Sequence, residues 1–316
     1  MRGAFCILVV IGMSNPINHV AVVGPVFLDI VMAGLDRLPA SGEEIHGASA
    51  SWAPGGYAIG AIAFSRLGMP THLFTEIGED ELGAVLRGRL TAEGVEVFSA
   101  PQVRTTNIAV ALNWNGDRGI VSYTQPFHDA SPEVNAFLES TPALVVVSAR
   151  HPHAKKICEA AHRKNLPVAL TLSWHPEFLV SRTLQQMLPF AQHLFCNVPE
   201  ALMATGQTDF RRALSILSES VEDVVVTRGA EGSVALVDGK FFEEPAIPSV
   251  LVDATGAGDV FAAGYLTAKM RGLSVTLQLR AGNWAAAQAI GALGGCTAAP
   301  RWAQVEQFLG LEVPRR

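Results

Sequence analysis

The chain has 316 residues, of which 49% are hydrophobic and 16% are charged, and its formal net charge is −6. This composition suits a large buried core and argues against long disordered tracts, while the length fits two average domains or one large α/β domain. The negative charge gives no electrostatic reason to expect binding to nucleic acid or to a membrane surface.

Residues 1–17 begin like a signal peptide, with Arg2 followed by an apolar run over residues 4–12. No small-x-small cleavage site follows, and the run is too short to span a bilayer. We interpret residues 1–17 as an N-terminal extension, with Met13 as a candidate start of translation. An extra edge strand is the alternative.

Two elements of the core are predicted next. Residues 19–24 form a short apolar run with β-branched side chains that ends in glycine, which predicts a buried strand. Residues 58–67 are small and apolar, and Gly68 and Pro70 follow them. This pattern predicts a packed helix that ends at the glycine.

A β-hairpin signal lies further along. Residues 108–114 alternate in polarity, residues 115–118 read Asn-Gly-Asp-Arg, and residues 119–123 return as a second strand. Residues 45–52 also alternate. These blocks predict a small sheet that stands apart from the core.

From about residue 140 the pattern alternates between strand and helix. Residues 143–147, 168–172, 193–196 and 223–227 are short apolar runs typical of strands, and residues 154–164 form a predicted helix. Such alternation predicts a doubly wound, mostly parallel sheet with helices on both faces.

A glycine-rich turn at residues 253–259 reads Asp-Ala-Thr-Gly-Ala-Gly-Asp and leads into an apolar helix. Gly256 and Gly258 permit close approach of a ligand, and with Ala257 they place backbone N–H groups at a helix N-terminus, which suits a phosphate. Asp259 beside them could accept the proton of an attacking hydroxyl, and the helix N-terminus is expected to keep it ionised at neutral pH. The turn therefore predicts phosphoryl transfer, with Asp259 as general base and residues 256–258 as an anion hole.

Polar side chains at predicted strand ends support one site. Asp29, Asn197, Thr227 and Asp259 all lie at or just after such an end. Ligands of open parallel sheets bind beyond the carboxyl ends of the strands. The chain has no Walker A sequence, and no G-x-G-x-x-G opens a helix after a strand, so P-loop and dinucleotide-binding interpretations are weak.

The four cysteines, Cys6, Cys158, Cys196 and Cys296, are widely separated and form no C-x-x-C pair. That spacing argues against a zinc site and a disulfide framework, and it fits a reducing cytoplasm. The nine histidines show no metal-ligand spacing.

Ordered motifs over roughly residues 18–300 resemble the ribokinase-like, or PfkB, carbohydrate kinases. They are residues 24–29, 54–56 with 61–68, 77–83, 197–200, 226–232 and 253–259. The resemblance implies an ATP-dependent kinase that phosphorylates a primary hydroxyl of a sugar. A nucleoside kinase of the same family is the alternative enzyme, and a ligand-binding relative without turnover is the alternative outside enzymes.

The resemblance also implies the domain layout. A ribokinase-like kinase domain would span residues 18–316, and a small β lid over the substrate would take its strands from about residues 42–53 and 106–124. Exposed edges of the lid strands predict that the lid closes over substrate and pairs two subunits as a homodimer.

On the acceptor side, the resemblance assigns Asp29 to substrate hydroxyls and Gly55 and Gly56 to close backbone approach. The chain departs from the family at two positions. Relatives commonly have Asn at the position of Gly60 and often Lys at that of Tyr57. Gly60 offers no side-chain hydrogen bond, and Tyr57 offers an aromatic face for stacking, which together favour a bulkier or less hydroxylated acceptor such as a nucleoside.

On the nucleotide side, the resemblance assigns Asn197 and Glu200 to water and Mg²⁺, with Mg²⁺ held through water. It assigns Thr227 and Gly229 to the phosphates of ATP, and Asn283 to the surroundings of the base.

Asp253 and Thr255 match positions that help to bind a monovalent cation such as K⁺ in relatives. Ordinary capping of the turn explains the same two residues. Cys296 and Ala299 occupy the later loop where relatives often place a further oxygen ligand.

Overall fold

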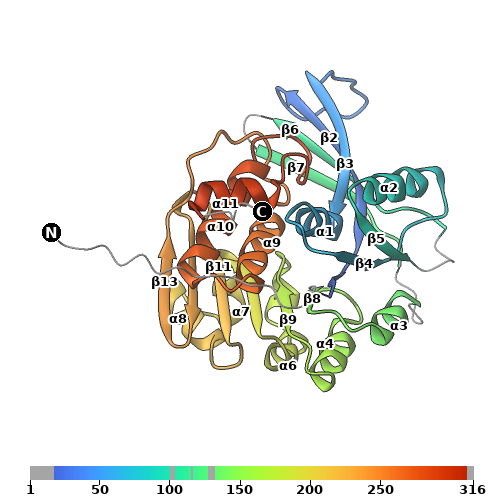
Figure 1. Cartoon of the computed structure of the whole chain (residues 1–316). Helices are drawn as coiled ribbons and strands as arrows, with labels where there is room; N and C mark the ends of the chain where they lie inside the picture. Colours follow the sequence, from blue (N-terminus) through green and yellow to red (C-terminus); the bar gives the residue numbers. More distant parts are fainter. Residues whose placement is uncertain (1–17, 100–103, 115–116, 127–131, 312–316) are drawn as a thin grey trace.

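The computed structural model describes residues 18–99, 104–114, 117–126 and 132–311. The predicted extension at residues 1–17 lies outside these ranges, as do the last five residues of the predicted domain. Figure 1 shows one large sheet flanked by helices and a smaller sheet that projects from it.

Within the described ranges the large sheet has nine strands, in the order β13-β12-β11-β10-β9-β8-β1-β4-β5. All neighbours from β11 to β5 pair in parallel, and β12 and β13 add an antiparallel edge. The doubly wound, mostly parallel sheet predicted from the sequence is confirmed. The strands are β1 (Val20–Val23), β4 (Thr71–Thr75), β5 (Val95–Ser99), β8 (Leu144–Ser148), β9 (Val168–Thr171), β10 (His193–Asn197), β11 (Asp223–Thr227), β12 (Ser233–Val237) and β13 (Lys240–Glu244).

Both faces of this sheet are covered, because successive side chains of a strand point to opposite faces. In β1, Val20 and Val22 join one apolar cluster, while Ala21 and Val23 join the other. The first cluster is covered by α1 (Tyr57–Arg66), α2 (Glu81–Ala92), α9 (Ala257–Met270), α10 (Val275–Ala289) and α11 (Trp302–Leu309). The second is covered by α3 (Pro132–Glu139), α4 (Ala154–Arg163), α5 (Pro176–Leu179), α6 (Arg182–Met187), α7 (Val198–Thr205) and α8 (Phe210–Leu217). The described residues also form two 3₁₀ turns, η1 (Leu188–Phe190) and η2 (Gly229–Glu231).

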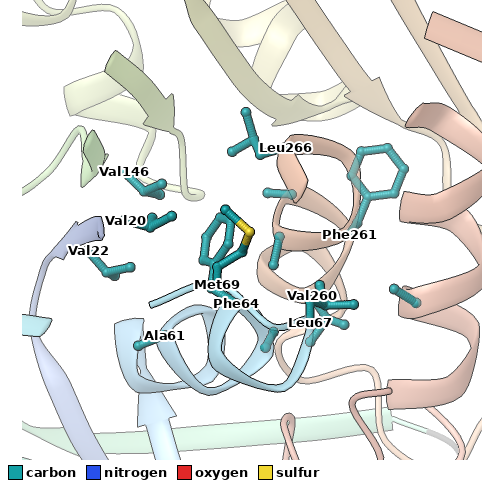
Figure 2. Packing of buried hydrophobic residues seen from close by; sticks show 14 of the residues in the cluster. Val20, Val22, Ala61, Phe64, Leu67, Met69, Val146, Val260, Phe261 and Leu266 are labelled. Carbon is teal, nitrogen blue, oxygen red and sulfur yellow. The ribbon is translucent and has the colours of Figure 1, made fainter. Parts of the chain in front are cut away.

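The helices α1 and α9 pack side by side on the same face of the sheet, which brings their N-termini to its carboxyl edge. Figure 2 shows Phe64 of α1 between the strand residue Val20 and the α9 residue Val260. Phe64 is 1% exposed, so truncating it to alanine would cost about 3–5 kcal/mol of stability. This packing fixes the two helix N-termini that carry the candidate site.

The small sheet has the order β3-β2-β6-β7. Its strands are β2 (Val26–Leu35), β3 (Ser49–Gly56), β6 (Ile108–Trp114) and β7 (Asp117–Tyr123). The separate sheet and its hairpin are confirmed, although residues 115–116 of the turn lie outside the described part.

The predicted lid segments differ from the structure in two respects. Strand β2 lies at the centre of the lid, pairing antiparallel with β3 and parallel with β6, and it was not predicted as a strand. The first predicted segment, residues 42–53, is strand only from Ser49 onward. Because β2 follows β1 after a break at Gly24 and Pro25, its residues look like a loop that leaves the core strand.

Candidate active site

The catalytic candidate Asp259 lies in the first turn of α9, as predicted. The turn before it depends on Gly256, whose φ of 69° lies in the left-handed region. A side chain at this position would also overlap Ile59 and approach Gly295. Gly258 has open space around it. The N–H groups of this turn thus lie at the positive end of α9, next to Asp259.

The ionisation of Asp259 differs from the sequence expectation. Burial of the carboxyl group, and to a smaller extent the negative charge of Glu200, raises the pKa of Asp259 to about 7. We expected the helix N-terminus to keep this group ionised, but removal from water outweighs that effect. A pKa near the working pH is well suited to a general base.

On the lid side, Asp29 lies on β2 directly over Gly55 of β3. A methyl group on Gly55 would overlap the carboxylate of Asp29, so only glycine fits at position 55. Gly56 precedes α1 with a left-handed φ of 59° and approaches the carbonyl of Pro25 too closely for a side chain. Gly55 therefore lets the Asp29 carboxylate lie against the backbone just before α1.

Tyr57, predicted to offer an aromatic face for stacking, begins α1 and packs its ring against the end of a core strand. The ring lies against Gly24 at the end of β1, where a methyl group would overlap it. Its hydroxyl forms hydrogen bonds with Thr171 and with Ser148. Burial raises the pKa of this hydroxyl, and the nearby charges of Asp259 and Glu200 act in the same direction.

Ser148 and Thr171 were not predicted as site residues. Each stands at the carboxyl end of its strand, β8 or β9. The strand-end rule that selected Asn197 and Thr227 could have found them.

Gly60 lies one turn further along α1 and faces Asp259. A methyl group on Gly60 would meet only the Cβ of Asp259, at 3.8 Å, which is ordinary van der Waals contact. The absence of a side chain at position 60 therefore leaves room beside the candidate base.

A cavity of about 510 Å³ opens on the other side of the α9 N-terminus. It is lined by three residues predicted for the nucleotide, Thr227, Gly229 and Asn283, and by two residues predicted for the anion hole, Ala257 and Gly258. The remaining lining is mainly small and apolar and comes from Ala230, Gly232, Ala246, Ile247, Pro248, Ser249, Leu251, Ala254, Phe261, Ala286, Ala287 and Ile290.

Two polar side chains near this cavity already bond to other groups of the protein. The side-chain amide of Asn283 donates to the carbonyl oxygens of Glu244 and Pro245, at 3.2 and 3.0 Å. Arg228 pairs with Glu243 at 3.4 Å and is not part of the cavity lining. Asn283 thus fixes the strand end that borders the cavity.

Asn197 and Glu200 form a reciprocal cap at the start of α7. The side chain of Asn197 accepts a hydrogen bond from the backbone N–H of Glu200, and the Glu200 carboxylate accepts one from the N–H of Asn197, both at 2.9 Å. Register pairs Asn197 with Thr227 on the next strand.

This corner of the site fits a hydrated Mg²⁺. Glu200 is 5% exposed, burial raises its pKa, and its charge is felt at Asp259. Within the described residues, neither the Glu200 nor the Asp259 carboxylate forms a salt bridge. No group of three His, Cys, Asp or Glu side chains in the described part could ligate a metal directly, so a cation here would be held through water and phosphate oxygens.

The Asp253 and Thr255 pair does not fit a monovalent cation in the same way. One oxygen of Asp253 accepts from both the backbone N–H and the hydroxyl of Thr255, at 2.9 and 2.7 Å, and the other accepts from the N–H of Gly294 at 3.0 Å. The carbonyl oxygens of Cys296 and Ala299 accept from Arg66. The carboxylate oxygens of Asp253 and the carbonyl oxygens of Cys296 and Ala299 thus already accept hydrogen bonds from the protein.

Comparison with known proteins identifies relatives of this arrangement. The model of the pfkB family carbohydrate kinases matches residues 18–302. The chain is 26% identical to a ribokinase of Bacillus subtilis over 304 residues, covering 92% of this chain and 99% of the relative. It is 29% identical to a cytidine kinase of Thermococcus kodakarensis, covering 69% and 81% of the two chains. The solved structure of an Arabidopsis thaliana ribokinase complexed with ribose and ATP superposes with a TM-score of 0.79 at 24% identity, covering 94% of this chain and all of that one.

Proposed function

We propose, from the premise that this chain belongs to the pfkB family of carbohydrate kinases, that it transfers the γ-phosphoryl group of ATP to a primary hydroxyl of a sugar. One observation supports this most directly. Asp259 stands between the acceptor side, where it faces Gly60, and the nucleotide cavity, which is lined by Ala257 and Gly258. A hydroxyl held beside Asp259 would face a phosphate bound at the α9 N-terminus.

The chemical step follows from this placement. Ionised Asp259 accepts the hydroxyl proton while the substrate oxygen forms a bond to the γ-phosphorus, and the bond from that phosphorus to the β-phosphate oxygen breaks to release ADP. Backbone N–H groups of residues 256–258 stabilise the charge on the transferring group. Asp29 accepts hydrogen bonds from other acceptor hydroxyls and orients the sugar.

Mg²⁺, held through water near Glu200 and Asn197, would neutralise charge on the phosphates when bound. Burial raises the pKa of Glu200, and a cation bound nearby would favour its ionised form.

A nucleoside acceptor is the second candidate. The space that Gly60 leaves beside Asp259 favours it, and the cytidine kinase relative acts on that class of acceptor. The hydrogen bonds from the Tyr57 hydroxyl to Thr171 and Ser148 hold its ring in one orientation, so a planar base could meet a fixed surface. A relative without turnover is the third candidate, against which Asp259 and its anion hole both argue.

The assembly and location proposals come from other observations. The lid exposes several large apolar side chains, Trp52, Ile120, Val121 and Tyr123 being each more than half exposed. The register places Trp52, Val121 and Tyr123 on one face of this sheet, and burying that face against a second copy would remove apolar area from water, which supports a homodimer through the lid. Cys158, Cys196 and Cys296 are unpaired and buried, which supports a reducing, cytoplasmic location. None of the helices in the described ranges is long and apolar enough to cross a bilayer.

A coupled ADP-release screen across hexoses, pentoses, sugar phosphates and nucleosides, with Mg²⁺ and ATP, tests the proposal. We expect acceptor-dependent ADP release with one class preferred. Failure of every acceptor to stimulate ADP release would leave the non-catalytic alternative. Light scattering tests the dimer, which a monomeric mass would contradict.

A further inference from the structure

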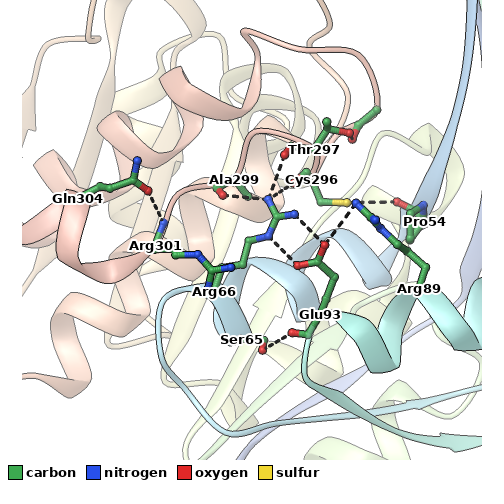
Figure 3. Close-up of polar contacts among 11 residues, drawn as sticks. Pro54, Ser65, Arg66, Arg89, Glu93, Cys296, Thr297, Ala299, Arg301 and Gln304 are labelled. Atoms are coloured by element: carbon green, nitrogen blue, oxygen red, sulfur yellow. Dashed lines mark hydrogen bonds and ion pairs between the residues drawn. The ribbon is translucent and has the colours of Figure 1, made fainter.

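Arg66, the last residue of α1, contacts three backbone carbonyl oxygens of one loop (Figure 3). Its Nη1 donates to the carbonyl oxygen of Cys296 at 2.8 Å and to those of Thr297 and Ala299 at 3.0 Å. Carbonyl oxygens that converge on one point repel one another and require a positive centre between them. The guanidinium group supplies that centre.

Glu93, which follows the C-terminus of α2, fixes the guanidinium group from the other side. Nε and Nη2 of Arg66 donate to the two oxygens of Glu93, both at 2.8 Å. The two side chains are only 13% and 12% exposed. A planar, two-bond pair of this kind holds the guanidinium in one orientation, so the positive charge stays at the carbonyl cluster.

The loop that Arg66 holds supports the anion hole directly. The N–H of Gly294 donates to Asp253 at 3.0 Å, which joins the loop to the start of the glycine-rich turn. Gly295 and Gly256 both pack against Ile59 of α1, and a methyl group on Gly256 would lie 3.3 Å from the Cα of Gly295. Displacing the loop would therefore displace the turn that precedes Asp259.

We propose that Arg66 is a positioning residue for the anion hole, and that its fixed charge makes phosphoryl transfer by this chain independent of an added monovalent cation. The inference rests on the proposed kinase function. It replaces the assignment of K⁺ to Asp253 and Thr255, because both carboxylate oxygens of Asp253 already accept hydrogen bonds and the hydroxyl of Thr255 donates one of them. A K⁺ ion at the carbonyl cluster would also be repelled by the guanidinium group.

The first test uses the unaltered protein. Its kcat with the best acceptor is measured in choline chloride, sodium chloride and potassium chloride at equal ionic strength. We expect the three values to agree within about twofold. A tenfold or greater stimulation by K⁺ over choline would overturn the proposal.

The second test uses Arg66→Met, with Arg89→Met as the matched control. Arg89 also pairs with Glu93, at 3.3 Å, and its side chain is 46% exposed. We expect Arg66→Met to lower kcat about 10- to 100-fold with little change in the acceptor KM, because the anion hole is displaced. Potassium should restore part of this kcat and raise the melting temperature of Arg66→Met, since the carbonyl oxygens can then bind it. Arg89→Met should show neither effect.

The outcomes separate a positioning role from a merely structural one. Loss of stability without any new response to K⁺ in Arg66→Met would contradict the proposal, as would an unchanged kcat. If Arg66→Met does not fold, Arg66→Lys keeps the charge and should remain insensitive to K⁺; stimulation of that variant by K⁺ would count against the idea.

A failure of the kinase proposal itself would look different. Wild-type protein would then release no ADP with any acceptor in any of the salts. Calorimetric binding of ADP in the same salts then tests Arg66 separately. Affinity that is insensitive to K⁺ in wild type and sensitive in Arg66→Met supports the proposal, and affinity that K⁺ raises in wild type refutes it.

Discussion

The two sides of Asp259 consist of different kinds of chemical group. The proposed nucleotide side is a cavity of backbone groups and small or apolar side chains from α9, α10 and the segments beside β11 and β13. The proposed acceptor side relies on individual polar side chains, with the Asp29 carboxylate lying over Gly55 and the Tyr57 hydroxyl hydrogen-bonded to Thr171. A site made of backbone keeps its shape when side chains change, whereas a site made of side chains changes specificity with single substitutions. The departures at Tyr57 and Gly60 both lie on the acceptor side.

The largest expected effect concerns the residue shared by both sides. Asp259→Asn keeps the size of the side chain but cannot accept the proton, so kcat should fall by about 10²–10⁴. Affinity for ATP should change little. Asp209→Asn, at the cap of α8 and outside the site, is the matched control.

The substitution Asp259→Asn should lower kcat without lowering the stability of the protein. Folding raises the pKa of Asp259 to about 7, so ionising it costs stability as the pH rises from its unfolded value through that range. The asparagine variant should melt at the same temperature as wild type or higher at pH 8. Near-normal kcat in this variant would show that Asp259 is not the base.

The pH dependence of kcat/KM should reflect the ionisation of Asp259. Only ionised Asp259 acts as base, so kcat/KM should fall about tenfold for each pH unit below about 7. Initial rates between pH 5 and 9 would check this, with the residual activity of Asp259→Asn expected to lack that limb. A flat profile from pH 8 to pH 6 would contradict the assignment of the raised pKa to the catalytic group.

A substitution on the proposed acceptor side should change the KM for the acceptor without changing the KM for ATP. In Gly55→Ala the added methyl group overlaps the Asp29 carboxylate and must displace it. We expect the acceptor KM to rise about 10- to 100-fold while the KM for ATP stays near its wild-type value. Gly88→Ala, in α2 where a methyl group meets nothing, is the control. Equal effects on both KM values would mean that the two sides are not independent.

The smallest effect tests specificity. Gly60→Asn fills the space beside Asp259, so it should weaken a nucleoside more than a hexose. The ratio of kcat/KM for nucleoside over hexose should fall by up to about tenfold. An unchanged ratio would contradict the proposal that the missing side chain at position 60 widens the acceptor site.

Local patterns were sufficient for much of the fold and of the site. The β-branched runs, the alternating strands of the hairpin and the glycine-rich turn before Asp259 each depend on neighbours in sequence. Strand ends of a parallel sheet meet at one edge whatever the loop sequences, so Asn197 and Thr227 could be placed together in advance.

Contacts between distant segments were decided only by the tertiary structure. The pairing of Arg66 with the carbonyl oxygens of a loop 230 residues away leaves no periodic mark in the sequence. The Tyr57 hydroxyl reaches Thr171 only because α1 packs beside β1, and β2 becomes a lid strand only because β3 and β6 pair with it. The pKa of Asp259 likewise depends on burial and on Glu200, which α7 brings close. Sequence periodicity reports which face of an element is buried, while long-range packing decides what that face meets.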